Sequence, residues 1–175
     1  MKVKSLLFLF LASLLMSFSS CQEITSAAAG LLASNDSSAV VFPVPLGSVS
    51  DYEKILTDAQ IRELDSLIVL HEMRTKQKIN IVTVKSIAPY SNQHDYSVDL
   101  LSNWDNGDSK DNSVLIVFSE KRKEVQITTG LDLKRKLTDK ECRRIVKKTM
   151  LPELEEENYF FGLKKGLKKI ITELQ

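Results

Sequence analysis

The stretch from Trp104 to Ser119 constrains the fold more than any other part of the chain, because it joins an acidic loop directly to an apolar strand. Its first half, residues 105–112, consists largely of turn-forming residues whose side chains carry oxygen atoms. Its second half, Val114 to Phe118, is continuously apolar and lacks the alternation of a strand with one wet face. Strands of this kind lie inside a sheet that is covered on both sides. The stretch therefore predicts a central buried strand with polar oxygen atoms at one of its ends.

Helix and strand patterns alternate along the rest of the domain. Thr57 and Gln60 have the spacing of a capping box, and apolar residues at helical spacing follow them. Pro152 should end the third of the expected helices, because proline interrupts the helical hydrogen-bond ladder. The pattern predicts helices at about 58–75, 93–104, 139–150 and from Asn158 onward, and strands at 79–84, 114–118 and 124–129.

The order of these elements indicates an α/β fold. Strand 79–84, helix 93–104 and strand 114–118 form a βαβ unit, which makes the two strands parallel. The short charged turn at 120–123 makes strand 124–129 antiparallel to its neighbour, and the alternating pattern of that strand is typical of one exposed face. We expect a small mixed sheet sandwiched between helices, an α/β/α and Rossmann-like arrangement.

The first 20 residues have the features of a targeting segment. A short positive region is followed by the apolar run Leu6–Met16, which is too short to indicate a membrane span. Ser19 and Ser20 directly before Cys21 resemble a bacterial lipobox, although Phe18 departs from the usual leucine. This predicts cleavage before Cys21 and lipid attachment to it. An ordinary secretory signal and an uncleaved anchor are the alternatives.

The remaining residues divide into a tether and one domain. Residues 21–47 are mostly small and polar and contain two prolines, which is typical of a tether with an extended lead-in, and residues 48–175 form the domain. The chain has 24 basic and 23 acidic residues and no nucleic-acid-binding motif, so no nucleic-acid partner is expected. Its two cysteines, Cys21 and Cys142, are too far apart in sequence to indicate a disulfide framework or a zinc site.

No motif for covalent catalysis is present. The sixth residue after Cys142 is Lys148, so the C-x5-R signature of cysteine phosphatases is missing. A buried, unreactive thiol is the better interpretation of Cys142. His71 is interpreted as a residue of a helix face and His94 as a first-turn surface residue. The acidic loop is the candidate site, because hard cations prefer several oxygen ligands, and a plain solvated loop is the alternative. The loop is not an EF-hand, since the twelfth residue counted from Asp105 is Ile116.

Several short motifs occur in an order that resembles the TPM domain family. They are Val49-Ser50-Asp51-Tyr52, Asp111-Asn112-Ser113-Val114-Leu115, Leu137-Thr138-Asp139, Met150-Leu151-Pro152 and Tyr159-Phe160-Phe161-Gly162-Leu163. The resemblance covers about residues 48–175. It implies an α/β/α sandwich with a divalent-cation site near the loop end of the sheet. Members of this family have been linked to acid phosphatase activity and to the assembly or repair of membrane complexes.

The resemblance and the acidic loop together imply a set of ligands for Ca²⁺ or Mg²⁺. The sequence departs from the family pattern where Asp132 replaces a glycine and Lys134 replaces a glutamate. Because Asp51, Asp111 and Asp139 each lie where an element begins, we expect their loops to converge, and a cation would relieve the repulsion between the carboxylates. The candidate metal ligands are Asp51, Asp108, Asp111, Asn112, Asp132 and Asp139.

These features predict a lipid-anchored protein of the cell envelope that faces the periplasm or the exterior. Its leader is similar to those of envelope proteins in the Bacteroides group. The expected function is that of a cation-binding module that assists assembly or maintenance of membrane or envelope proteins. The alternative is a metal-dependent acid phosphatase, in which a cation and a carboxylate activate water on a phosphomonoester. No catalytic residue follows from the sequence, and whether the chain is an enzyme stays open.

Overall fold

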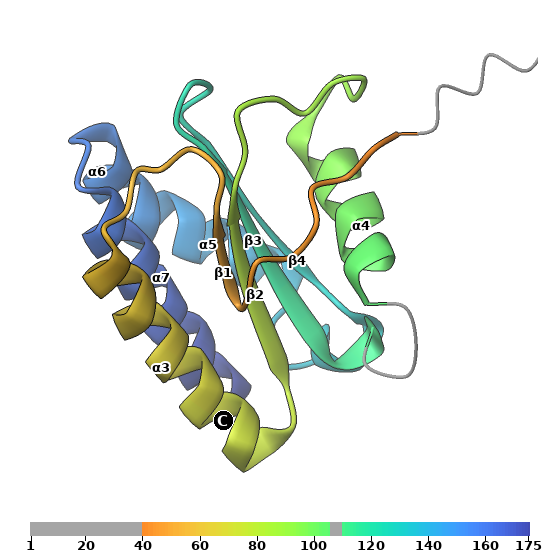
Figure 1. The fold of residues 1–175 in the computed structure, drawn as a ribbon. Coiled ribbons are helices and arrows are strands. Elements are labelled where there is room, and N and C mark those ends of the chain that lie inside the picture. Colours follow the sequence, from red (N-terminus) through yellow and green to blue (C-terminus); the bar gives the residue numbers. More distant parts are fainter. Residues whose placement is uncertain (1–39, 106–109) are drawn as a thin grey trace, which may run out of the picture. The chain divides into compact units, whose positions relative to one another are not determined.

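The computed structural model describes residues 40–105 and 110–175, so the predicted sites at Cys21 and Asp108 lie outside the described residues. The described residues form a four-stranded sheet with helices on both faces, which confirms the predicted α/β sandwich (Figure 1). The strands are β1 (Val49–Asp51), β2 (Lys78–Thr83), β3 (Ser113–Ser119) and β4 (Glu124–Thr129). The helices are α3 (Asp58–Thr75), α4 (Gln93–Trp104), α5 (Asp139–Ile145), α6 (Leu151–Glu155) and α7 (Tyr159–Leu174), with a π-helical segment, η3 (Val146–Met150), between α5 and α6.

The strands lie in the order β1-β2-β3-β4. The first three are parallel and β4 is antiparallel to β3, as the sequence predicted for β2, β3 and β4. All seven residues of β3 are buried, which confirms the interpretation of its apolar run. The sequence analysis did not predict β1, whose three residues pair with residues 81–83 at the end of the extended lead-in.

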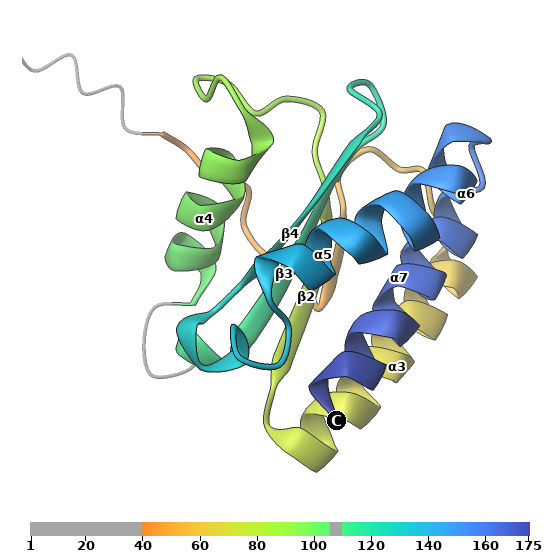
Figure 2. The ribbon, with the colours of Figure 1, turned by 180° about the vertical axis from the view of Figure 1, so that it is seen from behind.

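Two apolar cores lie against the two faces of the sheet. Ile116 and Phe118 belong to the larger core, with α3, α5, α6 and α7, whereas Leu115 and Val117 belong to the smaller core, with α4. The two ribbon views show α4 on one side of the sheet and the other helices on the opposite side (Figures 1 and 2). Each fully buried Leu, Ile, Val or Phe side chain contributes about 1.5–3 kcal/mol relative to exposure, so the two cores together dominate the stability.

The helical segment predicted to end at Pro152 continues past it, which corrects the boundary expected from the sequence. At the end of η3 the Leu151 N–H donates to the carbonyl of Val146, five residues earlier. A new helical start follows, and Pro152 lies in the first turn of α6. Proline is tolerated there because the first amides of a helix have no partner within it. The chain thereby extends its helical wall beside β4.

The lead-in packs on the α4 side of the domain. The ring of Phe42 lies 6.1 Å from that of Tyr90 and 5.7 Å from that of Tyr96, measured between centroids. Trp104 Nε1 donates a hydrogen bond to the carbonyl of Pro43 at 2.7 Å. Residues 41–175 thus form one compact unit. Among the helices of residues 40–105 and 110–175, none combines the length and the apolar character that a membrane crossing needs.

Two glycines allow α7 to pack closely on η3 and α6, and they generate a prediction. A Cβ at Gly162 would lie 2.8 Å from the Leu154 side chain and 3.2 Å from the Met150 carbonyl oxygen. For a Cβ at Gly166 the three nearest atoms, at 2.6–2.9 Å, all belong to the Met150 side chain. We expect Gly162→Ala to lower the free energy of unfolding by about 1–3 kcal/mol through overpacking. Urea denaturation followed by circular dichroism measures this change.

Gly166→Ala is the matched control for this substitution. It should cost less, because a methionine side chain adapts more easily than a backbone carbonyl. Helix propensity alone would make both substitutions stabilising by about 1 kcal/mol. A stabilised Gly162→Ala variant would therefore contradict the close-packing account.

Candidate functional site

The carboxylate of Asp51 is held by its own chain at the carboxyl end of β1. One oxygen accepts a hydrogen bond from Thr83 Oγ1 at 2.6 Å, and the other accepts from the Leu56 amide at 2.8 Å. Thr83 Oγ1 also accepts from the Glu53 amide at 3.0 Å. The chain leaves β1 and β2 toward opposite faces of the sheet, and ligands of α/β proteins commonly bind at such a point. Here the Asp51 carboxylate and the Thr83 hydroxyl use their hydrogen bonds on each other and on backbone amides. In this chain, Asp51 closes the turn from β1 to α3.

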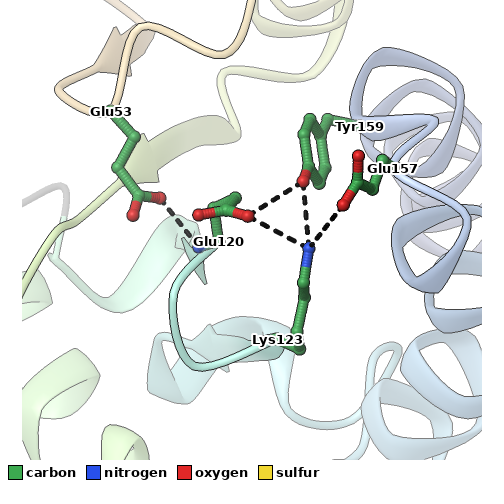
Figure 3. A network of polar contacts seen from close by, with 5 residues as sticks. All are labelled: Glu53, Glu120, Lys123, Glu157 and Tyr159. Atoms are coloured by element: carbon green, nitrogen blue, oxygen red, sulfur yellow. Dashed lines mark hydrogen bonds and ion pairs between the residues drawn. The ribbon is translucent and has the colours of Figure 1, made fainter.

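A second polar network joins the β3–β4 turn to the start of α7 (Figure 3). Lys123 Nζ lies 3.0 Å from Tyr159 Oη, 3.1 Å from Glu120 Oε1 and 3.6 Å from Glu157 Oε1. Tyr159 Oη is also 3.1 Å from Glu120 Oε1, and the Glu120 amide donates to Glu53 Oε2 at 2.9 Å. The hydrogen bonds from Lys123 and Tyr159 lower the pKa of Glu120, whereas burial raises the pKa of Glu53. We call this network the clamp, because it joins the β3–β4 turn to the segment after β1 and to the start of α7.

Asp111 and Asn112 lie at the opposite end of the sheet from Asp51. They belong to the short 3₁₀ helix η1 (Lys110–Asn112) before β3, and Asn112 Nδ2 donates to the carbonyl of Lys76 at 2.9 Å, which ties β3 to the end of α3. Because β1 and β3 are parallel, the end of one and the start of the other are about 17 Å apart along the strand direction. The structure thus separates Asp51 from Asp111, contrary to the predicted convergence of their loops.

The other predicted metal ligands divide in the same way. Asp139 begins α5 and lines the same groove as Asp111. Asp132 is exposed on the 3₁₀ helix η2 (Leu131–Leu133) and is not among the residues that line this groove. In the ranges that the structure describes, no group of three His, Cys, Asp or Glu side chains is placed to hold a metal ion. Binding of Ca²⁺ or Mg²⁺ stays a prediction, and Asp111 and Asp139 are the two described candidates that share a hollow.

This groove has a volume of about 1170 Å³ and runs along β4. Its walls are α4 on one side and α5 with η3 on the other, and Figure 2 shows β4 between these helices. Val98 on the α4 wall is 39% exposed, and Leu131 at one end of the groove is 68% exposed. The groove therefore presents apolar side chains to solvent beside the edge of the sheet.

The open edge of β4 supplies backbone hydrogen-bonding groups to the groove. The Gly130 amide donates to the Ser113 carbonyl at 2.8 Å, which sets the alternation of hydrogen bonds between β3 and β4. In an antiparallel pair, every second residue turns both its N–H and its C=O toward the partner strand. The N–H and C=O groups of Val125, Ile127 and Thr129 consequently point away from β3, toward a side on which the described residues place no further strand.

The burial of the β4 side chains alternates in the first half of the strand, as the sequence predicted, since Glu124 and Gln126 are half-buried and Val125 and Ile127 are buried. Val125 and Ile127 belong to the larger core. On the other face, the hydroxyl oxygens of Thr128 and Ser97 lie 2.6 Å apart, so a polar residue that looked solvent-facing is paired with α4. Thr128 is therefore covered by α4, whereas the Glu124 and Gln126 side chains on the same face stay partly exposed.

Three cationic side chains, Lys134, Arg143 and Lys147, line the groove with Asp111 and Asp139. In the described part of the chain, none of the three cations lies within 4.0 Å of a carboxylate oxygen. The groove thus has more positive than negative side chains.

The groove also contains the Cys142 thiol, which is buried on its α5 wall. Burial and, to a smaller extent, the charge of Asp139 raise the pKa of this thiol to about 12. The thiol is therefore protonated at neutral pH and a poor nucleophile, as expected from the sequence.

The sequence analysis did not identify Val125, Ile127 and Thr129 as functional residues. The sequence signal that could have identified them was the position of β4 in the order of elements. β4 is the last strand, a hairpin joins it to β3, and only helical patterns follow it. No later segment of the domain was available to pair with its second edge.

Comparisons with known proteins agree with this fold. Residues 49–173 match the sequence profile of the family described as the TPM domain. The N-terminal domain of a protein from P. gingivalis is 26% identical, with a TM-score of 0.67 over 73% of this chain and 81% of that one. The BA42 protein of the psychrophilic bacterium Bizionia argentinensis is 21% identical, with a TM-score of 0.59 over 70% and 83%.

A third solved structure, the N-terminal domain of the cg2496 protein from Corynebacterium glutamicum, is similar in fold. It is 14% identical, with a TM-score of 0.59 over 78% of this chain and 87% of that one. The search among curated proteins found no match.

The clamp in Figure 3 generates a pH-dependent prediction. Because the folded state lowers the pKa of Glu120 below its ordinary 4.5, this carboxylate stabilises the fold above that pH, and the stabilisation is lost as the pH falls through the lowered pKa. Glu120→Gln should therefore be less stable than the parent chain at pH 7, with the difference shrinking toward pH 3. Thermal denaturation across this pH range measures it.

Glu156→Gln is the control, since Glu156 is an exposed carboxylate at the end of α6. Its stability should follow that of the parent chain at every pH. A Glu120→Gln deficit of constant size from pH 7 to pH 3 would show that the Glu120 charge does not stabilise the clamp.

Proposed function

Because the chain belongs to the TPM domain family, we propose that it is a lipid-anchored binding module of the cell envelope that assists the assembly or maintenance of envelope proteins by holding a protein partner. The observation that carries the proposal is the groove along β4. There, an open strand edge, exposed apolar side chains and cationic side chains without carboxylate partners among the described residues lie together. These are features of a surface that recognises a polypeptide.

The groove supports binding better than it supports phosphate ester hydrolysis. Arg143 and Lys147 have the charge to hold a phosphate, but the thiol beside them, Cys142, is protonated at neutral pH. The carboxylates predicted to act together are divided between opposite ends of the sheet. The acid phosphatase alternative consequently has charge in its favour, but residues 40–105 and 110–175 bring no reactive group together in the groove.

The lipid anchor is supported by the sequence Ser19-Ser20-Cys21 at the end of the apolar leader. Each acyl methylene buried in a membrane contributes about 0.8 kcal/mol, so several chains on Cys21 would hold the protein firmly. Removal of Lys2 and Lys4 with the leader would leave the chain nearly neutral. The lipid, and not charge, would then be the source of membrane attachment.

Photo-crosslinking in intact cells tests the partner-binding role. A photoreactive amino acid at Val98, on the α4 wall, should capture a protein that remains with the membrane fraction. The same amino acid at Met73 is the control, because Met73 is 70% exposed on α3 and does not line the groove. Gel electrophoresis and mass spectrometry of the adducts provide the measurement. Without crosslinking, Cys21→Ala should release the protein from the membrane fraction or leave its precursor uncleaved.

Three other outcomes would each remove a part of the proposal. The same adducts from Val98 and Met73 would contradict recognition by the groove. A processed, membrane-bound Cys21→Ala protein would contradict the lipid anchor. Hydrolysis of p-nitrophenyl phosphate by the purified full chain, lost in Arg143→Gln, would favour the phosphatase alternative.

Cation binding is the remaining part of the proposal, with Asp111 and Asp139 as its ligands in the groove. The fit is partial, since three cationic side chains share the groove, and the proposed binding of a partner does not depend on the ion. We expect millimolar Ca²⁺ or Mg²⁺ to raise the melting temperature, because a ligand at 100 times its Kd adds about 2.7 kcal/mol. Asp111→Asn should remove most of the rise.

Asp132→Asn is the matched control for the cation, because Asp132 is exposed outside the groove. It should keep the rise in melting temperature. A rise that depends on Asp132 and not on Asp111, or calorimetry that detects no binding, would contradict a cation in the groove and leave the partner-binding role in place.

A further inference from the structure

We propose that the partner enters the groove as an extended segment that pairs with β4 as a fifth strand, and that this segment alternates apolar residues with carboxylates. The inference rests on the proposed function, because it specifies the chemistry and the conformation of the partner at the same groove.

The edge of β4 lacks three of the features that prevent strand addition, namely proline, lysine and a bulge. Its six residues, Glu124–Thr129, include no proline and no lysine, and its register with β3 runs without a bulge. Edge strands with none of these features are templates for a further strand. At about 3.3 Å per residue the edge is about 20 Å long, which suits a segment of six residues.

The side chain of Gln126 occupies one position that such a strand would take. Its Nε2 donates to the carbonyl of Ile127 at 3.0 Å and lies 3.4 Å from Nδ1 of His94. The Ile127 carbonyl points away from β3, so the amide of Gln126 supplies the hydrogen bond that a neighbouring strand would otherwise donate. An incoming segment can replace this bond with its own N–H, and the Gln126 amide then turns to solvent.

The two walls of the groove differ, and this difference determines the pattern of the segment. Side chains of an added strand would point alternately toward α4 and toward α5 with η3. The α4 wall presents the apolar Val98 and Leu101. The other wall presents two cations, Arg143 and Lys147, which lie four residues apart on one helical face, and one carboxylate, Asp139, so its net charge is positive. Apolar residues facing α4 and acidic residues facing α5 match these surfaces.

A second copy of this chain fits the groove less well than an acidic segment. Pairing of β4 with β4 would bring Arg143 and Lys147 of both copies to the same edge, where like charges repel. Lys134, at the end of the groove, would add to this repulsion. The helical walls on both sides of β4 also obstruct the edge of a second sheet, whereas a single extended strand has no walls of its own.

The test uses the full chain in detergent micelles and a capped eight-residue peptide in which Val and Ile alternate with Glu. Hydrogen exchange of individual amides, followed by NMR, reports the pairing. On addition of the peptide, the amides of Val125, Ile127 and Thr129 should exchange at least tenfold more slowly. Those of Gln126 and Thr128 should change little, because they already face β3.

Two altered peptides separate the contributions of backbone and charge. N-methylation of the peptide amides on one edge removes the donors for β4, and each of the two edges is methylated in turn. Replacement of every Glu by Lys reverses the charge. The Lys peptide and one of the two methylated peptides should bind at least tenfold more weakly. The double variant Arg143→Glu, Lys147→Glu should instead prefer the Lys peptide, and both positions are exposed, so the fold should tolerate these changes.

The outcomes separate this inference from the proposed function. Peptide binding that slows none of the three edge amides, or equal binding of both methylated peptides, would overturn strand addition while leaving the groove as a partner site. No binding of the acidic peptide, with a partner still captured at Val98, would overturn the stated chemistry of the segment. The absence of any specific Val98 adduct would overturn the proposed function itself.

Discussion

Burial of β3 on both faces is the constraint on which the rest of the structure depends. Its seven residues are all buried, and the side chains between its terminal serines are apolar. Such a strand is stable only when helices cover both faces of the sheet. The chain provides α4 on one face and α3, α5, α6 and α7 on the other. A hairpin then adds β4 beside β3, and because only helices follow, β4 becomes the open edge of the sheet.

The groove beside this edge is held open by buried polar contacts. Gln93, which is 1% exposed, donates through Nε2 to the carbonyl of Val117 at 2.9 Å and to that of Glu124 at 3.1 Å. Together with the Ser97–Thr128 contact, these bonds fix the α4 wall to both strands of the hairpin. The π-helical segment η3 continues the opposite wall from α5 as far as Met150, and α6 begins directly after it with Pro152 in its first turn. A preformed groove lowers the entropic cost of binding, so an extended segment of modest length can bind there.

The fold could be predicted from the sequence wherever a local pattern agreed with the tertiary environment. The bounds of α3 and its capping box at Thr57 were predicted because the cap residues and the apolar period point to the same helix. The three-residue β1 was missed, since it is too short to show a period and is stabilised by pairing with β2. The helix that contains Pro152 was missed, because it follows a π-helical segment in which an amide bonds to the carbonyl five residues earlier. The presence of a proline does not reveal this change of hydrogen bonding.

The candidate site was less predictable than the fold, because it depends on which strand ends lie at the same edge of the sheet. Asp51 is the last residue of a strand and Asp111 precedes the start of a parallel one, so the sheet separates them. Asp139 and Asp111 do share a groove, but the edge of β4 that defines this groove consists of backbone groups, which no side-chain motif reveals. Alternation in β4 indicated a wet face, and Glu124 and Gln126 on that face are half-buried, but α4 covers Thr128 at its end.

A crystal structure of the full chain with its crosslinked partner would test the central claim most directly. The account predicts an extended partner segment hydrogen-bonded to the backbone of Val125, Ile127 and Thr129, with carboxylates beside Arg143 and Lys147. A partner seated on the exposed apolar side chains of α3, Val69, Leu70 and Met73, with the β4 edge unpaired, would contradict it.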